Sequence, residues 1–249
     1  MKDIVLSKRM ETVVNMVLPQ SVVIADIGCD HAYVSIALVQ RGLAKKVIAM
    51  DVRSGPLGIA KKNVTAYGEQ QRVELRLSDG MQALEPGEAD TVIIAGMGGL
   101  LIKRILERGL KHGIAAETPP VLILQPQSDQ QEVRIFLYRN AYHIVKEQML
   151  FEDGKYYIVL KAIPYSAEEQ EESPYTHAEW VYGRYGLEHR DAVLYEYLKN
   201  EQIKLRGILT RLDQECDGKE MLPDKTANRL AQVKEEMRTN EEAMQYYRI

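Results

Sequence analysis

The chain has few cysteines, no long apolar run and no strong excess of either charge. Only Cys29 and Cys216 are cysteines among 249 residues. This excludes a disulfide scaffold and a zinc site built from cysteine alone, and it indicates a reducing, cytoplasmic location. No stretch of about 18 apolar residues exists, so we expect no membrane span. Residues 1–20 contain acids and lack a continuous apolar segment, unlike a secretory signal. No cluster has metal-ligand spacing, so we expect no metal.

The charges divide unevenly along the chain. The net charge of −4 argues against a generally basic nucleic-acid coat. Residues 1–163 hold 20 Lys and Arg against 18 Asp and Glu, whereas residues 164–249 hold 12 against 18. The acidic segment 165–173 lies between the two parts. We therefore expect two domains, residues 1–164 and residues 165–249.

Short apolar runs separated by helical patterns fill residues 21–163. Such runs predict buried parallel strands of successive β-α-β units. They are SVVIADIG, KVIAMDV, RVELRL, DTVIIAG and PVLILQP. RVELRL alternates polar and apolar residues, so we place it nearer the edge of the sheet. Two further runs, AYHIVKEQML and YYIVLKAIP, flank Asp153-Gly154 and predict an antiparallel hairpin. The pattern indicates an α/β fold whose parallel sheet ends in that hairpin.

The last third of the chain has the leucine spacing of paired helices. One set steps by four, seven, three and four, at Leu194, Leu198, Leu205, Ile208 and Leu212. A second set is Leu230, Val233 and Met237. We expect two antiparallel helices forming a short coiled-coil arm, with Glu201 at one contact position as an imperfection. The arm could fold back or dimerise, and we favour a monomer.

The turn after the first predicted strand indicates the type of ligand. Glycine there allows close approach of the backbone, and the following helix presents its N-terminus. A dinucleotide-binding turn would read G-x-G-x-x-G, but here Gly28 is followed by Asp30 and Ala32 and not by further glycines. An acid at this place would repel a pyrophosphate. It suits a ligand that has an ammonium group and no phosphate, such as the methionine part of S-adenosylmethionine.

Polar residues and glycines follow the other predicted strands at the same edge of the sheet. Asp51, after the second strand, can accept hydrogen bonds from both hydroxyls of a ribose. Asp79, after the third, can accept from the exocyclic amine of an adenine. Asp26, Asp51 and Asp79 could also cap helices or close turns. Their joint position at strand ends favours a cofactor site.

The order DIGCDHA, MDV, SDG, AGMGG and LQPQ resembles class I S-adenosylmethionine-dependent methyltransferases. With LSKRM near the start, DHAY in the turn and a helical extension, the chain resembles the bacterial tRNA (adenine-N1)-methyltransferases that act on adenine 22 of the D-arm. The resemblance implies a Rossmann-like seven-stranded sheet, S-adenosylmethionine as cofactor and tRNA as partner. The cofactor-binding residues that we expect are Arg9, Asp26, Gly28, Asp30, Asp51, Val52, Asp79, Gly80, Gly96 and Met97.

The expected reaction is methyl transfer to N1 of adenine. Enzymes that methylate the exocyclic amine usually have an Asn-Pro-Pro-Tyr motif after the fourth strand, where this chain has AGMGG. A ring nitrogen already offers a lone pair, so alignment matters more than a base. Asp30, His31 and Gln125 are nevertheless the catalytic candidates, and Asp30 could stabilise the cationic product. His31 fits a structural role better, and Cys29 fits a small buried residue.

Basic and amide residues provide candidate contacts to RNA. The expected substrate-binding residues are Lys8, Arg53, Lys103, Arg104, Gln125 and Gln127. Lys103, Arg104, Arg108 and Lys111 could hold phosphates as a stripe, or they could form a solvated helix face. Gln125 and Gln127 could contact the target base or satisfy loop backbone groups. The aromatic residues of segment 175–185 could stack on bases, although anchoring the arm to the catalytic domain is favoured.

Three other functions remain open at this point. The first is methylation of a small molecule or a protein, which leaves the arm and the basic helix without a purpose. The second is a non-catalytic RNA-binding protein of the same fold, which the acids at three strand ends disfavour. The third is a nicotinamide-dependent oxidoreductase, which Asp30 and Ala32 in the turn disfavour. Titration with each cofactor and salt-dependent tRNA binding separate these alternatives.

Overall fold

The chain folds into two compact units, residues 1–171 and 172–249. The computed structural model describes residues 4–18, 21–114, 118–165, 175–216 and 224–248. The predicted domain boundary at residues 164–165 lies beside segment 166–174, which is outside the described residues, as is most of the acidic segment. Among the described helices, none is long and apolar enough to cross a membrane.

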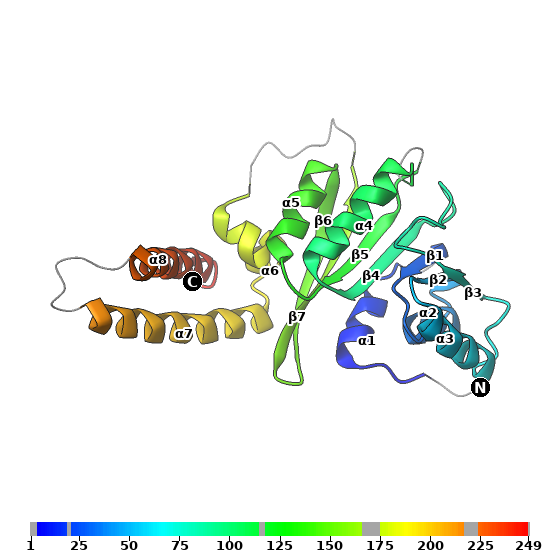
Figure 1. Ribbon diagram of the computed structural model, residues 1–249, viewed down its shortest axis with the longest axis horizontal. Coiled ribbons are helices and arrows are strands. Elements are labelled where there is room, and N and C mark those ends of the chain that lie inside the picture. Colours follow the sequence, from blue (N-terminus) through cyan, green and yellow to red (C-terminus); the bar gives the residue numbers. More distant parts are fainter. Residues whose placement is uncertain (1–3, 19–20, 115–117, 166–174, 217–223, 249) are drawn as a thin grey trace. The chain divides into compact units, whose positions relative to one another are not determined.

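The first unit is built on the expected seven-stranded sheet (Figure 1), and its strand order is β3-β2-β1-β4-β5-β7-β6. The parallel strands are β1 (Ser21–Ile27), β2 (Ala44–Asp51), β3 (Val73–Leu77), β4 (Thr91–Met97) and β5 (Val121–Pro126). The antiparallel hairpin is β6 (Tyr142–Glu152) with β7 (Lys155–Pro164). The chain order reverses between β1 and β4, and ligands of such sheets bind outside the carboxyl ends at this point.

Helices cover both faces of the sheet, which explains the continuous apolar runs of its strands. One face packs against α1 (Lys8–Asn15), α2 (Tyr33–Gln40) and α3 (Ser54–Ala66). The other packs against α4 (Gly99–Lys111) and α5 (Gln130–Arg139). Successive residues of β4 illustrate this, because Ile93 faces the first core and Ile94 the second, both fully buried. Burying each contributes roughly 1.5–3 kcal/mol.

The short helix α1 places residue 9 beside the sheet. Ser7 is its N-cap and accepts a hydrogen bond from the backbone N–H of Met10. Val13 and Val14 are fully buried against the first core, and Glu11 forms a bidentate ion pair with Arg41. These contacts fix the helix in position, so that the half-buried Arg9 of its first turn reaches Gln125 at the carboxyl end of β5.

The second unit consists of helices. It contains a π-helix (Glu179–Gly183), α6 (Arg184–Glu188), α7 (Ala192–Cys216) and α8 (Asp224–Gln245). Leu205 packs with Val233 and Met237, whereas Leu198 accepts a hydrogen bond from Asn240, so α7 and α8 run antiparallel as expected. Glu201, the expected imperfection, accepts hydrogen bonds from Tyr182, Tyr197 and Asn240. The polar residue is thus paired rather than left unsatisfied.

Candidate functional site

A cavity of about 600 Å³ opens at the carboxyl ends of β1, β2 and β4. Its volume is in the usual range of small-molecule sites. All ten residues expected to bind a cofactor line it: Arg9, Asp26, Gly28, Asp30, Asp51, Val52, Asp79, Gly80, Gly96 and Met97. They come from α1 and from the ends of four strands. Residues that are far apart in the sequence are therefore brought to one side of the sheet.

The turn after β1 is tightly folded. Gly28 has φ +75°, and a Cβ there would lie 2.1 Å from the Met97 side chain. Asp30 and Ala32 also adopt left-handed conformations, which non-glycine residues rarely do. The N–H groups of Gly28 and Cys29 donate to the carbonyl of Met50, each at 2.8 Å, and fasten the turn to β2. The positive φ favours glycine at the first position of the turn, and a Cβ there would displace the end of the Met97 side chain.

Asp26 provides a buried carboxylate at the floor of the cavity. It is 4% exposed, and Ser35 Oγ donates to its Oδ2 at 2.5 Å. Burial raises the pKa of Asp26 to about 6, with a smaller contribution from the charge of Asp51, while the Ser35 hydrogen bond lowers it. A cation bound beside Asp26 would favour its charged form.

Asp51 joins the turn after β1 to the loop after β2. Its Oδ2 accepts from the N–H of Asp30 at 3.3 Å, and its Oδ1 accepts from the N–H of Arg53 at 2.9 Å. The Arg53 Nε also lies 3.8 Å from Oδ1. Each carboxylate oxygen can accept two hydrogen bonds, so acceptor capacity is left for a ligand hydroxyl in the cavity.

The loop after β3 presents Asp79 and Gly80 to the cavity. Asp79 forms an ion pair with Arg108 of α4, with Oδ2 and Nη1 2.7 Å apart. Both side chains are about half exposed. Arg108 belongs to the basic stripe that could hold phosphates, but in the structure its guanidinium binds Asp79. Gly80 has φ +64° and packs against Ile105, which brings the loop close to α4.

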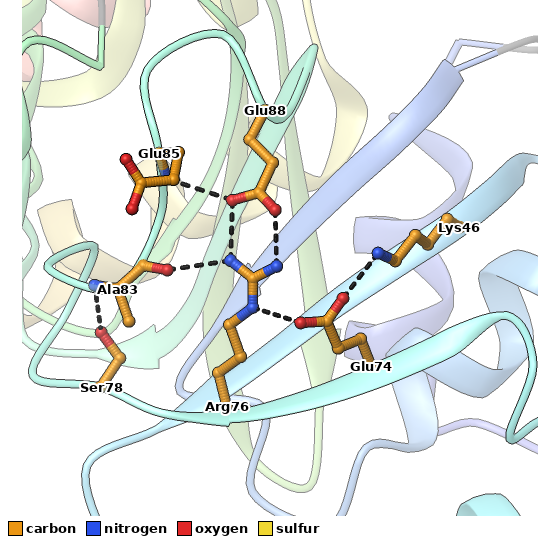
Figure 2. A network of polar contacts seen from close by, with 7 residues as sticks. All are labelled: Lys46, Glu74, Arg76, Ser78, Ala83, Glu85 and Glu88. Carbon is orange, nitrogen blue, oxygen red and sulfur yellow. Dashed lines mark hydrogen bonds and ion pairs between the residues drawn. The ribbon is translucent and has the colours of Figure 1, made fainter.

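Arg76 of β3 holds this loop through the network in Figure 2. Its guanidinium forms a bidentate pair with Glu88, donates to the carbonyl of Ala83 at 2.9 Å and pairs with Glu74. Hydrogen bonds from Arg76 and Lys46 lower the pKa of Glu74 to about 2. The segment from Ala83 to Glu88 is thereby fixed to the edge strand. The alternating pattern of RVELRL predicted the edge position correctly but not this network.

Three residues meet where β4 departs from regular pairing with β5. The register shifts between Ala95 and Met97, at Gly96. Gln125 of β5 is fully buried, and its Oε1 accepts from the Gly96 N–H at 3.0 Å and from Arg9 Nη1 at 2.9 Å. The sequence left open whether Gln125 contacts a target base or the loop backbone. The structure places it against the backbone, outside the cavity lining.

The other candidates near the cavity differ in position. Asp30 and His31 lie at the mouth, with Asp30 Oδ1 and His31 Nε2 3.7 Å apart, and the rings of His31 and Tyr33 meet edge to face at 6.2 Å. Gln127 and Arg53 also line the cavity. Cys29 is buried as expected, and this burial raises the pKa of its thiol. A raised thiol pKa disfavours a nucleophilic role.

The remaining candidates for RNA contact lie outside the cavity lining. Lys8 Nζ donates to the carbonyl of Phe151 at 3.2 Å, and Lys103 pairs with Glu132 of α5 at 3.1 Å. Arg104 is exposed on α4. Within the described parts of the chain, no group of three or more His, Cys, Asp or Glu residues could hold a metal ion.

The aromatic segment of the second unit forms stacked pairs. Tyr175 stacks on Trp180 with ring centroids 4.3 Å apart, and the Arg184 guanidinium lies 3.8 Å from the Tyr175 ring. Tyr185 stacks on His189 at 3.9 Å. These contacts lie within the second unit. Base stacking and anchoring to the first unit both stay predictions.

The chain is similar in sequence and in fold to known methyltransferases. A methyltransferase domain family matches residues 6–160. The curated tRNA (adenine(22)-N(1))-methyltransferase of Bacillus subtilis is 34% identical over 217 residues, which are 87% of this chain and 90% of that protein. The crystal structure of the B. subtilis m1A22 tRNA methyltransferase TrmK superposes with a TM-score of 0.82 at 30% identity, covering 97% of this chain and all of that one. A Streptococcus pneumoniae structure in complex with S-adenosyl-L-methionine has a TM-score of 0.79 at 30% identity, covering 96% of this chain and all of that one.

Proposed function

Because the chain belongs to the family of tRNA (adenine(22)-N1)-methyltransferases, we propose that it transfers a methyl group from S-adenosylmethionine to N1 of adenine 22 in tRNA. The observation that supports this most directly is the cavity itself. It combines two buried carboxylates, Asp26 and Asp51, with a guanidinium from α1 at the carboxyl edge of the sheet.

The residues of the cavity fit S-adenosylmethionine. Asp51 has unused acceptor capacity for ribose hydroxyls, and Asp79 lies at the next strand end, where it can accept from an adenine amine. Asp26 and Asp30 suit the ammonium of the methionine part, and Arg9 suits its carboxylate. A Cβ at Gly28 would fill space between the turn and Met97. When bound, the cofactor supplies an electrophilic methyl group on a sulfonium centre.

The fourth strand ends in a glycine-rich segment that borders the cavity at Gly96 and Met97. Gly96 and Gly98 lack side chains, and Gly99 packs so closely that a Cβ would lie 2.4 Å from the carbonyl of Ser128. An enzyme that acts on a base inside a folded RNA must take it out of its stack. We propose that this glycine segment and Gln127 accept the adenine, and that Tyr33 and His31 border its entry.

The reaction depends on the alignment of N1 with the methyl group more than on proton transfer. N1 of adenine offers a lone pair, so holding it in line with the methyl group supplies most of the effect. The sulfonium charge disappears as the methylated ring becomes cationic. Asp30, at the mouth of the cavity, is placed to stabilise that positive charge. We propose this role for Asp30, with His31 beside it as its partner.

We propose that the RNA backbone contacts basic residues around the cavity. Arg53 lines it directly, whereas Lys8, Lys103 and Arg104 lie on neighbouring helices. The charges of such residues add a salt-dependent contribution to affinity. We propose that the protein is a cytoplasmic monomer with domains of residues 1–164 and 165–249. No membrane or metal partner is proposed.

The decisive experiment compares two transcripts. An unmodified bacterial tRNA with adenine at position 22 and the same tRNA with guanine there are incubated with methyl-labelled S-adenosylmethionine. We expect label in the first transcript and loss of at least about 90% of it in the second. Equal labelling of both would contradict the position. Label in neither, with cofactor binding intact, would favour a small-molecule or protein substrate.

A further inference from the structure

We propose that Gln125 is a positioning residue that holds the guanidinium of Arg9 toward the carboxylate of the cofactor and itself contacts neither cofactor nor RNA. The proposal rests on the cofactor site described above and deepens it. It gives a function to a buried amide that lies next to the cavity without lining it.

The first observation is the irregular pairing at Gly96. Gly96 has φ +78°, and the register between β4 and β5 shifts at this residue. A backbone N–H buried at such a shift needs a replacement acceptor. The side-chain carbonyl of Gln125 provides one at 3.0 Å. The Gly96 N–H therefore holds the side-chain oxygen of Gln125 in a fixed position at the end of β4.

The second observation is that the same oxygen accepts a hydrogen bond from Arg9 Nη1 at 2.9 Å. The Arg9 guanidinium also lies 5.3 Å from the centre of the Tyr157 ring, and a Cβ at Gly96 would be 3.5 Å from Nη1. A long side chain loses about 1.5–2 kcal/mol of rotamer freedom when it is fixed. Gln125 and Tyr157 fix Arg9 before any ligand arrives.

The third observation concerns charge. Among the described residues, the Arg9 guanidinium forms no ion pair, since its side-chain partner is the neutral amide of Gln125. The other arginine that lines the cavity, Arg53, lies 3.8 Å from Asp51 at the ribose end. The uncompensated charge of Arg9 is thus available at the β4 end, where the methionine part and its carboxylate belong. A carboxylate in place of the Gln125 amide would cancel it.

The test measures cofactor affinity by calorimetry, without RNA, using S-adenosylmethionine and its decarboxylated analogue. The analogue keeps the adenosine, the sulfonium and the ammonium but lacks the carboxylate. We expect Gln125→Leu, Gln125→Glu and Arg9→Met each to weaken binding of S-adenosylmethionine about tenfold, the value of a charge-assisted hydrogen bond. Binding of the analogue should change less than about twofold. The double variant Arg9→Met with Gln125→Leu should bind no more weakly than Arg9→Met, because the two residues act as one unit.

Matched controls make each outcome interpretable. Gln148→Leu repeats the amide change at an exposed position of the β6–β7 hairpin, and Arg238→Met removes a guanidinium that pairs with Glu235 on α8. Both should leave the two affinities unchanged. Equal losses for the cofactor and its analogue, or additive losses in the double variant, would overturn the proposal. If Gln125→Leu fails to fold, Gln125→Glu and Arg9→Met decide alone. Absence of methyl transfer to tRNA would instead contradict the proposed function.

Discussion

The carboxylate of Asp51, at the end of β2, accepts a hydrogen bond from the backbone N–H of Asp30, in the turn after β1, at 3.3 Å. The same carboxylate binds the N–H of Arg53, and the Asp51 carbonyl accepts from Ser78 at the end of β3. One residue thus connects three strand ends that border the cavity. Its side chain both shapes the site and offers acceptors to a ligand.

Replacement of Asp51 should therefore weaken cofactor binding. Asp51→Asn keeps one oxygen of similar shape but removes the charge, and we expect about a tenfold loss of affinity. Asp51→Ala should lose about a hundredfold. Calorimetric titration with S-adenosylmethionine measures both. Asp90→Asn is the matched control, because Asp90 accepts from the N–H groups of Val22 and Val23 away from the cavity. An equal loss in the control would remove the assigned role.

Cofactor affinity should depend on pH through Asp26. The pKa of this buried carboxyl is raised to about 6, so its negative charge is present above pH 6 and is lost below it. Since the charged form attracts the ammonium, affinity should fall by up to about tenfold per pH unit below 6. Titrations between pH 5 and 7 test this, because a free α-ammonium stays protonated throughout.

Two variants check that Asp26 is the group responsible. Asp26→Asn should bind more weakly and lose the pH dependence. Ser35→Ala removes a hydrogen bond that lowers the pKa of Asp26, so the midpoint should move to a higher pH. A midpoint that stays in place in both variants would assign the titration to another group.

Gly28 should be more sensitive to substitution than a glycine with the same backbone conformation elsewhere. Gly28 and Gly68 both have φ +75°, but a Cβ at Gly68 meets nothing within 4 Å. Gly68→Ala should cost about 1 kcal/mol of the free energy of unfolding through backbone strain alone. Gly28→Ala should cost more and also weaken cofactor binding at least about tenfold, since Met97 must move. Chemical denaturation with cofactor titration measures both effects.

Loss of the Arg76 network should impair cofactor binding, because the network holds the loop after β3. Arg76→Met and Arg72→Met each remove a guanidinium that binds a glutamate and a backbone carbonyl near β3. Both should lower the free energy of unfolding by about 1–3 kcal/mol. Only Arg76→Met should raise KM for S-adenosylmethionine, because Arg76 holds the loop that presents Asp79. Equal changes of KM in both variants would show that general destabilisation is the cause.

Much of the fold could be predicted because buried parallel strands have a strong sequence pattern. The continuous apolar runs that end in Asp26 and Asp51 predicted two buried parallel strands and the edge of the sheet at which these two acids lie. Asp153-Gly154 predicted the turn of the hairpin. Arg9 is different. No periodicity connects a residue of the first helix with the end of β4, so only the family resemblance placed it at the cavity.

The interactions that depend on tertiary register could not be predicted from the sequence. The role of Gln125 follows from a register shift at Gly96, which leaves no local pattern. The pairing of Arg108 with Asp79 depends on how α4 packs beside the loop after β3 in the folded protein. On sequence alone, Arg108 could contact phosphates or lie on a solvated helix face, and Gln125 could contact a target base or loop backbone groups. Charge and polarity do not reveal which partner a side chain has.

Identification of the methylated nucleoside is the decisive test of the proposed reaction. Unmodified tRNA is incubated with the protein and methyl-labelled S-adenosylmethionine, digested near neutral pH and separated by chromatography with mass detection. We predict that the label elutes as 1-methyladenosine and that Asp51→Ala reduces it at least about tenfold. Label in N6-methyladenosine or in any other nucleoside would contradict methyl transfer to the ring nitrogen.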